Sequence, residues 1–369
     1  MIADRLFMRR ALRLAARGVG CVSPNPLVGA VIVRDGRIVA QGWHRAVGRE
    51  HAEVDALRQA GDDARGADLF VNLEPCCHFG RTPPCTRAVI AAGIRRVVVA
   101  HVDPNPLVAG KGVAALRAAG VVVEVGLLEA EARELNAAFL KWISTGRPLV
   151  TLKMAMTLDG RTADRDGGSH WITSVESRRE VHRMRAHADA VMVGAGTASR
   201  DDPLLLPVLF RSRRKPLRVV VDEVASLSLS SRLVATALQS PVLVATTDAA
   251  DESRVQALAG QKVQIAKLPA LDGGIDIEAL LTELGRRSIG SLLVEGGPTL
   301  AATLLRNDLV DRLVLFVAPR LLGDPMALPL VGDLGLRDLA AARSFCVKSI
   351  RSVGPDVRID LAPDTPVLT

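Results

Sequence analysis

The sequence predicts an α/β protein that folds as two domains. The chain has 369 residues, which is enough for two domains at roughly 150 residues each. Short apolar segments bounded by Gly and Pro alternate with amphipathic segments along both halves, and this indicates strands alternating with helices. A linker-like Ser-Thr-Gly-Arg-Pro run at residues 144–148 separates the halves, so we expect a first domain over residues 1–147 and a second over residues 148–369.

Composition is that of a globular protein and excludes several functions. Hydrophobic residues make up 49% and charged residues 24% of the chain, and no apolar run reaches the roughly 18 residues of a membrane helix. The net charge of +7 favours phosphorylated ligands at least as much as nucleic acid. Because Tyr is absent and aromatics are only 3%, a catalytic Tyr acid is excluded and stacking platforms for nucleic acid are not expected.

The cysteines indicate metal binding or reduced thiols. Three of the five, Cys76, Cys77 and Cys85, fall within ten residues of one another. An odd, clustered set in a chain with no recognisable secretory signal argues against a disulfide framework and predicts a cytoplasmic protein.

Two interpretations fit the amino terminus. Met8, Ala11, Leu12 and Ala15 recur at helical spacing, and three arginines lie off that stripe. Such a segment is compatible with a transit peptide, but we favour the first helix of the first domain because strand signals follow almost at once.

The first half continues with alternating elements. Apolar segments at residues 30–33 and 37–40 flank Asp35-Gly36, a pair that favours the tight turn of a β-hairpin. Further strands are predicted over residues 68–73, 96–102 and 121–125, and helices over residues 51–60, 86–92, 112–119 and 128–143. The pattern predicts a layered domain with a mostly parallel sheet.

The second half repeats this alternation. Strands are predicted over residues 149–154, 190–193, 217–221, 242–245, 262–265, 291–294 and 313–317, and helices over residues 175–188, 277–285 and 299–306. Residues 203–216, rich in Leu, Pro and Arg, are predicted as a surface loop.

Four residues of the first half predict a catalytic zinc site. His51 and Glu53 stand at the start of a predicted helix, Cys76 follows a strand, and Cys85 follows a Pro-rich turn. One imidazole and two thiolates supply three zinc ligands and leave a fourth position for water, as catalytic zinc requires. Glu53 can reach that water without binding the metal and can pass its proton to a leaving amine.

This His-x-Glu…Pro-Cys…Cys pattern is the signature of zinc-dependent nucleobase deaminases. Their usual second half is Cys-x-x-Cys, whereas here the spacing is Cys-x₈-Cys. A closed structural site with Cys77 or His78 as fourth ligand is the alternative. The choice of Cys76 over Cys77 rests on the preceding Pro75.

At these residues the chain resembles a known family. The run Leu73–Cys85, with His51-Ala-Glu53 upstream, closely resembles the bifunctional deaminase–reductases of riboflavin biosynthesis. Other segments share the resemblance in the expected order, namely residues 24–29, 103–112, 153–160, 169–173, 201–203 and 294–300. It implies a cytidine-deaminase-like three-layer domain followed by a dihydrofolate-reductase-like α/β domain.

The resemblance also implies two reactions in series with Zn²⁺ and NADPH as cofactors. A diamino-ribosylaminopyrimidinone 5′-phosphate is first deaminated hydrolytically, and the ribose of the product is then reduced to a ribityl chain. It implies that the first substrate is held by Asn25, His44, His78, Arg81, Asp103 and Asn105. Arg81 is the candidate for the phosphate, because a guanidinium binds phosphate oxygens in a forked pair.

For the reductase, the resemblance assigns the catalytic role to Lys153, which would polarise or protonate the C1′ centre of the opened sugar. Substrate contacts are implied for Ser169, Arg185, Leu205 and Glu295. Cofactor contacts are implied for Ala155, Trp171, Thr197, Asp201, Gly297, Pro298, Thr299, Leu300, Ala301, Ala302 and Thr303.

Apart from the resemblance, one motif of the second half predicts phosphate binding. Glu295-Gly-Gly-Pro follows a predicted strand and opens a helix, so backbone N–H groups and the helix N-terminus can approach a phosphate. Gly194-Ala-Gly196 is a weaker dinucleotide signal, because Ser199 replaces the third glycine.

Two positions depart from the family pattern. Relatives carry an arginine for the substrate phosphate where this chain has Val208, and Arg211 or Arg213 could substitute for it. Relatives commonly have Ser where this chain has Glu223, whose charge would repel a cofactor 2′-phosphate if it pointed inward.

Two other functions are compatible with the zinc pattern. One is a deaminase of RNA or of free nucleosides with an unrelated second domain, which the cysteine spacing and the few aromatics disfavour. The other is a non-catalytic zinc module for assembly, in which Glu53 would have no use. We expect a small phosphorylated pyrimidine as ligand, no nucleic acid or membrane partner and, from the resemblance, a homo-oligomer.

Overall fold

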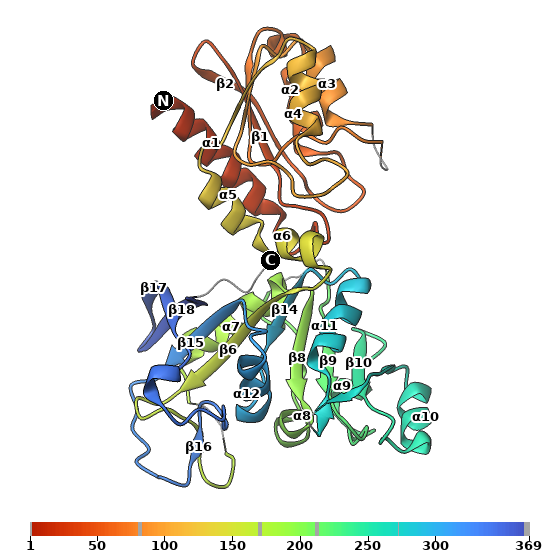
Figure 1. Cartoon of the computed structure of the whole chain (residues 1–369), viewed down its shortest axis with the longest axis vertical. Coiled ribbons are helices and arrows are strands. Elements are labelled where there is room, and N and C mark those ends of the chain that lie inside the picture. Colours follow the sequence, from red (N-terminus) through yellow and green to blue (C-terminus); the bar gives the residue numbers. More distant parts are fainter. Residues whose placement is uncertain (1, 80–82, 169–171, 211–213, 272, 365–369) are drawn as a thin grey trace. The chain divides into compact units, whose positions relative to one another are not determined.

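The computed structural model describes residues 2–79, 83–168, 172–210, 214–271 and 273–364. The chain divides into two compact units, Met1–Gly146 and Arg147–Thr369 (Figure 1). Among the described residues no helix is long and apolar enough to span a membrane.

The first unit is built on a five-stranded sheet with the order β2-β1-β3-β4-β5. Its strands are β1 (Gly29–Arg34), β2 (Arg37–Trp43), β3 (Asp68–Val71), β4 (Arg96–Val99) and β5 (Val122–Val125). The predicted hairpin is confirmed, since β1 and β2 pair across Asp35 and Gly36, whose φ angles of 49° and 73° match a two-residue hairpin turn.

Helices cover both faces of this sheet and complete three layers (Figure 1). On one face lie α1 (Ile2–Ala15) and α5 (Glu129–Leu135), which bury Met8, Leu14 and Ala132 against Phe70. On the other lie α2 (Ala52–Ala60), α3 (Cys85–Ala91) and α4 (Lys111–Ala118). The apolar stripe predicted for the first helix therefore faces the sheet, although Leu12 is only partly buried. Short 3₁₀ helices occupy Ala16–Gly18 and Gly61–Ala64.

The sequence prediction for this unit is wrong in three places. Residues 128–143 form two helices, α5 and α6 (Ala137–Thr145), because Asn136 lies outside helical geometry and its amide bonds to the backbone of Leu27. The sheet is not mostly parallel, since β1 runs antiparallel to both β2 and β3, while β3, β4 and β5 are parallel. A two-residue turn can join only antiparallel strands, so the hairpin makes the β1 and β2 edge of the sheet antiparallel. The predicted linker is also shorter, because α6 extends to Thr145.

The second unit contains a nine-stranded sheet with the order β11-β10-β9-β8-β14-β6-β15-β18-β17. Its strands are β6 (Leu149–Met156), β8 (Ala190–Gly194), β9 (Leu217–Val221), β10 (Val242–Thr246), β11 (Gln264–Lys267), β14 (Ser291–Val294), β15 (Arg312–Val317), β17 (Phe345–Val353) and β18 (Asp356–Pro363). All neighbours are parallel except at β18, which is antiparallel to both β15 and β17. Small pairs join β7 (Arg161–Ala163) to β16 (Leu328–Pro329) and β12 (Ala270–Leu271) to β13 (Gly274–Ile275).

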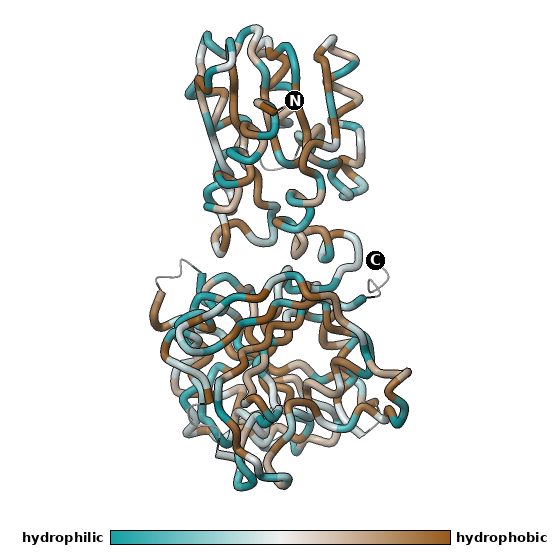
Figure 2. Tube along the Cα trace, turned by 90° about the vertical axis from the view of Figure 1, so that its left-hand side faces the viewer, coloured by the Kyte–Doolittle hydropathy of each residue, from teal (hydrophilic) through white to brown (hydrophobic). Residues whose placement is uncertain are grey.

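Helices also cover both faces of the second sheet. The helices α11 (Ile277–Arg286) and α12 (Pro298–Arg306) pack on one face, which includes Leu152 and Val294. The other face is covered by α7 (Val175–His187), α8 (Ala195–Asp201), α9 (Arg232–Ala235) and α10 (Glu252–Gly260). Figure 2 shows hydrophobic residues running along the strands of each unit. A 3₁₀ helix spans Leu339–Ala341.

The sequence analysis missed the carboxyl-terminal hairpin of β17 and β18. Most of β17 is exposed, including Val347 and Ile350, and polar residues interrupt its apolar pattern. The helices α8, α9 and α10 were also not predicted. The predicted loop after Pro203 is confirmed for residues 203–210 and 214–216, which contain no helix or strand.

Candidate active sites

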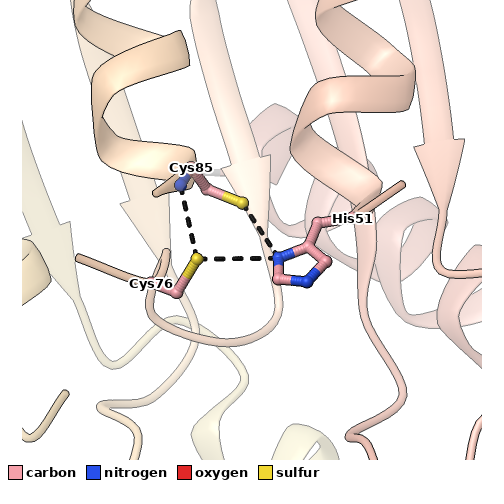
Figure 3. Close-up of side chains that lie close together, drawn as sticks. All are labelled: His51, Cys76 and Cys85. Atoms are coloured by element: carbon pink, nitrogen blue, oxygen red, sulfur yellow. Dashed lines mark hydrogen bonds between the residues drawn. The ribbon is translucent and has the colours of Figure 1, made fainter. Parts of the chain in front are cut away.

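Three side chains of the first unit form a candidate metal site (Figure 3). The Nδ1 atom of His51 lies 3.1 Å from Sγ of Cys85 and 3.6 Å from Sγ of Cys76. The three donor atoms lie within 4.8 Å of one another. One nitrogen and two sulfur donors match the chemistry of zinc.

The fold brings these residues together from separate elements. His51 is the N-cap of α2, Cys85 is the first residue of α3, and Cys76 lies in the loop after β3. The helix α2 approaches β2 closely because Gly42 has no side chain, and a Cβ there would lie 2.4 Å from the Ala52 carbonyl oxygen. Glycine on the strand therefore lets His51 come near the cysteines.

The site favours a thiolate beside a protonatable acid. Hydrogen bonding with Cys85 lowers the pKa of Cys76 to about 4, and His51 acts in the same direction. Burial raises the pKa of Glu53 to about 7, and this carboxyl neighbours the Cys85 thiol. Glu53 is 3% exposed and is not one of the three clustered ligands. It is thus placed to exchange a proton near the metal position.

A fourth protein ligand is absent from the cluster in the described part of the chain. The Cys77 thiol is directed to the Leu107 carbonyl oxygen at 3.9 Å, and Nδ1 of His78 is buried without a hydrogen-bond partner. Neither belongs to the His51, Cys76 and Cys85 group, so this geometry supports an open rather than a closed zinc site.

The second unit contains a cavity of about 270 Å³ at the carboxyl ends of β6, β8 and β14. Ligands of open parallel sheets commonly bind at this edge. The predicted residues that line it are Lys153, Ala155, Arg185, Thr197, Asp201, Glu295, Gly297 and Pro298. Residues predicted from β6, α7, α8 and the turn between β14 and α12 thus meet in one pocket.

A buried ion cluster forms one wall of this pocket. Arg185 makes a forked pair with Glu295, with Nε–Oε1 and Nη2–Oε2 distances of 2.6 and 2.9 Å. Nζ of Lys153 lies 3.8 Å from Oε2 of Glu295. Although burial disfavours its charge, Arg185 keeps the pKa of Glu295 below its usual range. Burial also lowers the pKa of Lys153, which makes it a ready proton donor.

The pocket also reaches the amino-terminal end of α12. Gly297 is the N-cap of this helix and Pro298 its first residue. A Cβ on Gly296 would lie 2.8 Å from a methyl carbon of Leu300, so glycine permits this close packing. Bare backbone beside a helix N-terminus suits the phosphates of a dinucleotide such as NADPH.

Comparison with known proteins supports both sites. The model of the RibD C-terminal domain matches residues 148–359, and that of the cytidine and deoxycytidylate deaminase zinc-binding region matches residues 1–101. A riboflavin biosynthesis protein RibD from Aquifex aeolicus is 43% identical over 356 residues, covering 96% of this chain and 97% of that protein. The chain belongs to the RibD family. It is therefore a bifunctional deaminase and reductase of riboflavin biosynthesis that uses Zn²⁺ and NADPH.

Other RibD proteins match over similar lengths. RibD from Escherichia coli strain K12 is 44% identical over 370 residues, covering 97% of this chain and 99% of that protein. The solved structure of Acinetobacter baumannii RibD, form 1, has a TM-score of 0.87 at 38% identity and covers 99% of both chains. A Thermotoga maritima structure, described as a diaminohydroxyphosphoribosylaminopyrimidine deaminase/5-amino-6-(5-phosphoribosylamino)uracil reductase, has a TM-score of 0.86 at 37% identity, covering 98% of this chain and 99% of that chain.

In this RibD chain, predicted substrate residues of the deaminase lie beside the metal ligands. Nδ2 of Asn25 lies 3.1 Å from Nε2 of His44, and the His44 ring meets the His51 ring edge-on at 5.7 Å. Burial lowers the pKa of His44 and raises that of Asp103 to about 6. Asp103 accepts the backbone N–H of Asn105 at 2.9 Å. Arg81 lies outside the described residues.

Several predicted RibD reductase residues are not on the pocket wall. Leu205, Leu300 and Ala301 are buried in hydrophobic cores, and Ala302 is buried as well. Thr299 and Thr303 follow the N-cap of α12 without lining the cavity. Thr299 and Leu300 lie in the first turn of α12, where backbone N–H groups have no partner within the helix. The backbone N–H of Ala301 is already bonded to the Gly297 carbonyl oxygen. Ser169, Trp171, Arg211 and Arg213 lie outside the described residues. Val208 is 61% exposed, and Glu223 is not among the pocket-lining side chains.

Sequence reasoning missed the residues that hold the RibD deaminase loops. Buried Asn72 accepts the backbone N–H of Gly29 and donates to the Leu27 carbonyl, both at 2.8 Å. Glu74 accepts three backbone N–H groups of residues 103–113. The sequence offered one signal for Asn72 and Glu74, which is a polar residue just after a buried strand. It did not reveal their hydrogen-bond partners, because these lie far along the chain.

Proposed function

We propose that the first unit hydrolyses the 2-amino group of 2,5-diamino-6-ribosylamino-4(3H)-pyrimidinone 5′-phosphate. The second unit then reduces the ribosyl group with NADPH, which gives 5-amino-6-ribitylaminouracil 5′-phosphate. The observation that carries this proposal is the convergence of His51, Cys76 and Cys85 beside the buried Glu53. The description of the Thermotoga maritima relative supports the choice of substrate.

In the deaminase, His51, Cys76 and Cys85 would hold the zinc ion, which supplies Lewis acidity that activates water. Glu53 accepts a proton from the attacking water and delivers a proton to the departing amine. The C–N bond breaks, ammonia leaves, and a carbonyl remains on the pyrimidine. A carboxyl whose pKa is about 7 can both accept and donate at neutral pH.

The first substrate would be held by residues around this centre. Asn25 and His44 lie on one side, where the neutral His44 imidazole bonds both the Asn25 amide and the Glu50 backbone. Asp103 and Asn105 lie in the loop held by Glu74, and His78 approaches Asp103 closely enough to affect its pKa. We assign the phosphate to Arg81, because its guanidinium suits a forked contact.

In the reductase, Lys153 would act at the C1′ centre of the opened sugar. NADPH, when bound, supplies the hydride, and Lys153 supplies the proton or the polarising charge. Glu295 holds the ammonium group, and Arg185 holds Glu295 by two hydrogen bonds. Substrate contacts are proposed for Ser169, Arg185, Leu205 and Glu295, and cofactor contacts for Ala155, Trp171, Thr197, Asp201 and residues 297–303.

A coupled assay tests the proposal. Purified full-length protein is given the pyrimidinone phosphate and NADPH, and ammonia release, NADPH oxidation and bound zinc are measured on one sample. We expect one zinc ion per chain and equal amounts of ammonia and oxidised cofactor. A zinc-loaded protein that releases no ammonia from this substrate would contradict the deaminase assignment.

We also propose a cytoplasmic homo-oligomer that takes a small phosphorylated pyrimidine and no nucleic acid. The free cysteines of the zinc site support a reducing compartment, and self-association is supported by the family resemblance. Sedimentation of the purified protein measures the oligomeric state, and a monomer at micromolar concentration would oppose it.

A further inference from the structure

The reductase pocket carries more positive than negative charge. Among the described residues that line it, four are cations, Lys153, Arg178, Arg185 and Arg200, and two are carboxylates, Asp201 and Glu295. The other titratable group among these described residues is His182, whose pKa is lowered by burial, so its imidazole is uncharged at neutral pH. An excess of two positive charges favours a ligand that carries a dianionic phosphate.

Most of these cations are already engaged. Lys153 and Arg185 share the Glu295 carboxylate. Arg178 donates to the Thr173 carbonyl oxygen at 2.8 Å. Arg200 differs, because within the described part of the chain it makes neither a hydrogen bond nor an ion pair. Its guanidinium thus keeps its donors available to a ligand.

Arg200 is exposed, but its guanidinium contacts a neighbouring loop. It lies one helical turn after Thr197 on α8, and both residues line the pocket. Its guanidinium rests against the backbone of Gly167, where a Cβ would lie 2.8 Å from Cζ of Arg200. The φ angle of Gly167 is +83°, a conformation that favours glycine. Glycine at position 167 therefore allows the loop and the Arg200 guanidinium to approach each other closely.

The loop that bears Gly167 is itself held in place. Oδ1 of Asp164 accepts the backbone N–H groups of Asp166 and Gly168 at 3.0 and 2.7 Å. This loop leads to Ser169, one of the proposed substrate contacts. Residues 203–210 of the loop after α8 include no charged side chain, and further along this loop Arg214 is paired with Asp189. Among the described residues that line the pocket, Arg200 is therefore the cation that has no partner.

We propose that Arg200 is a phosphate-binding residue of the reductase pocket and recognises a phosphate monoester dianion. This inference rests on the proposed function for its two sources, the 5′-phosphate of the substrate and the 2′-phosphate of NADPH. A guanidinium presents two parallel N–H donors to phosphate oxygens, and each charge-assisted bond is stronger than a neutral one. Glu295 competes for Lys153 and Arg185, which leaves them less suited to this task.

Direct binding to the full-length protein tests the inference. Calorimetry measures ribose 5-phosphate and adenosine 2′-phosphate, with ribose and adenosine as their unphosphorylated counterparts. We expect Arg200→Gln to weaken one of the two esters roughly ten- to a hundredfold, as the loss of a charged hydrogen bond predicts. The ester that is affected identifies the source of the phosphate, and Arg200→Lys should restore part of the affinity.

The matched control is Arg337→Gln, which removes an exposed arginine of the same unit outside the pocket and should change neither affinity. Equal binding of both esters to wild type and Arg200→Gln would overturn the inference, as would an equal loss for the unphosphorylated compounds. Ester binding that depends on Arg200 in a protein that does not reduce the proposed substrate would instead sustain this inference and reject the proposed reaction.

Discussion

Oε2 of Glu74 accepts the backbone N–H of Gly110 at a distance of 2.9 Å. The same carboxylate accepts the N–H groups of Asp103 at 3.1 Å and Val113 at 2.9 Å. Glu74 is 3% exposed and lies two positions before Cys76. One buried anion therefore ties the loop that carries Asp103 to the segment that carries a proposed zinc ligand.

Glu74→Gln should impair substrate binding in the deaminase more than its chemistry. The amide oxygen can replace only part of the carboxylate's acceptor capacity, and each buried donor left unpaired costs about 1–3 kcal/mol. We expect KM for the pyrimidinone phosphate to rise roughly tenfold, with kcat less affected and zinc retained. The readouts are steady-state ammonia release and metal content.

Glu131→Gln is the control for this change, because Glu131 is exposed on α5. Reduction of pre-deaminated substrate by Glu74→Gln should equal that of wild type, since Glu74 lies in the first unit. An unchanged KM for deamination would show that the loop keeps its position without this carboxylate.

Glu53→Gln should separate metal binding from proton transfer. The amide preserves the shape of the side chain but cannot accept the proton of the attacking water. Because Glu53 is not one of the clustered ligands, zinc should stay bound. Ammonia release should fall by roughly 10²–10⁴, the usual contribution of a general acid–base group.

In the same Glu53→Gln protein, oxidation of NADPH on pre-deaminated substrate should persist. Cys85→Ser provides the comparison, because removal of a thiolate should lower both zinc content and ammonia release. Deamination at the wild-type rate by zinc-loaded Glu53→Gln would remove Glu53 from the proposed mechanism.

The zinc site was predictable because its pattern is local. His51 and Glu53 are two residues apart, and Cys76 and Cys85 flank one Pro-rich loop, so sequence spacing contains most of the geometry. Glu74 was missed because its partners are 29–39 positions away. The same holds for Asn136, which breaks a predicted helix through contacts 109 positions distant.

The strands of the fold were likewise predictable where the signal is local and were missed where it depends on distant residues. Buried parallel strands such as β8 and β14 have continuous apolar runs and were predicted within a residue or so. The exposed strand β17 gains its structure from pairing with β18 and has no such run. The role proposed for Arg200 could not be predicted from the sequence either, because the residues around it do not distinguish a pocket cation from a surface charge.

The pH dependence of reduction should report the Lys153 ammonium. Burial lowers the pKa of Lys153 below its usual value, and only the protonated ammonium group can donate a proton. Reduction should therefore decline as the pH rises through the lowered pKa, in a range below 10.5. The measurement is kcat for NADPH oxidation on pre-deaminated substrate across this range.

Two variants identify the group behind this decline. Lys153→Arg keeps the positive charge to much higher pH, because a guanidinium has a pKa above about 12, so its residual activity should lack the decline. Lys153→Met should lose reduction and keep ammonia release. A wild-type pH profile in Lys153→Arg would assign the decline to another group.

The carboxyl-terminal hairpin should stabilise the helix that supplies several pocket residues. Asp356, the first residue of β18, is 2% exposed, and its Oδ2 accepts the backbone N–H of Ser174 at 2.8 Å and the Ser177 hydroxyl at 2.5 Å. Both partners lie at the start of α7, which carries Arg185. Asp356→Ala leaves these donors unpaired, at a cost of about 1–3 kcal/mol.

We expect Asp356→Ala to lower the Tm of the full-length protein by several degrees and to raise KM for the reductase substrate. Asp360→Ala is the matched control, since Asp360 lies in the same hairpin, is 25% exposed and pairs with Arg358. Such partly exposed pairs contribute roughly 0–1 kcal/mol. Equal Tm values for the two variants would mean that the hairpin does not anchor α7 through Asp356. A lower Tm with unchanged KM would limit its role to stability, because α7 would keep Arg185 in place without it.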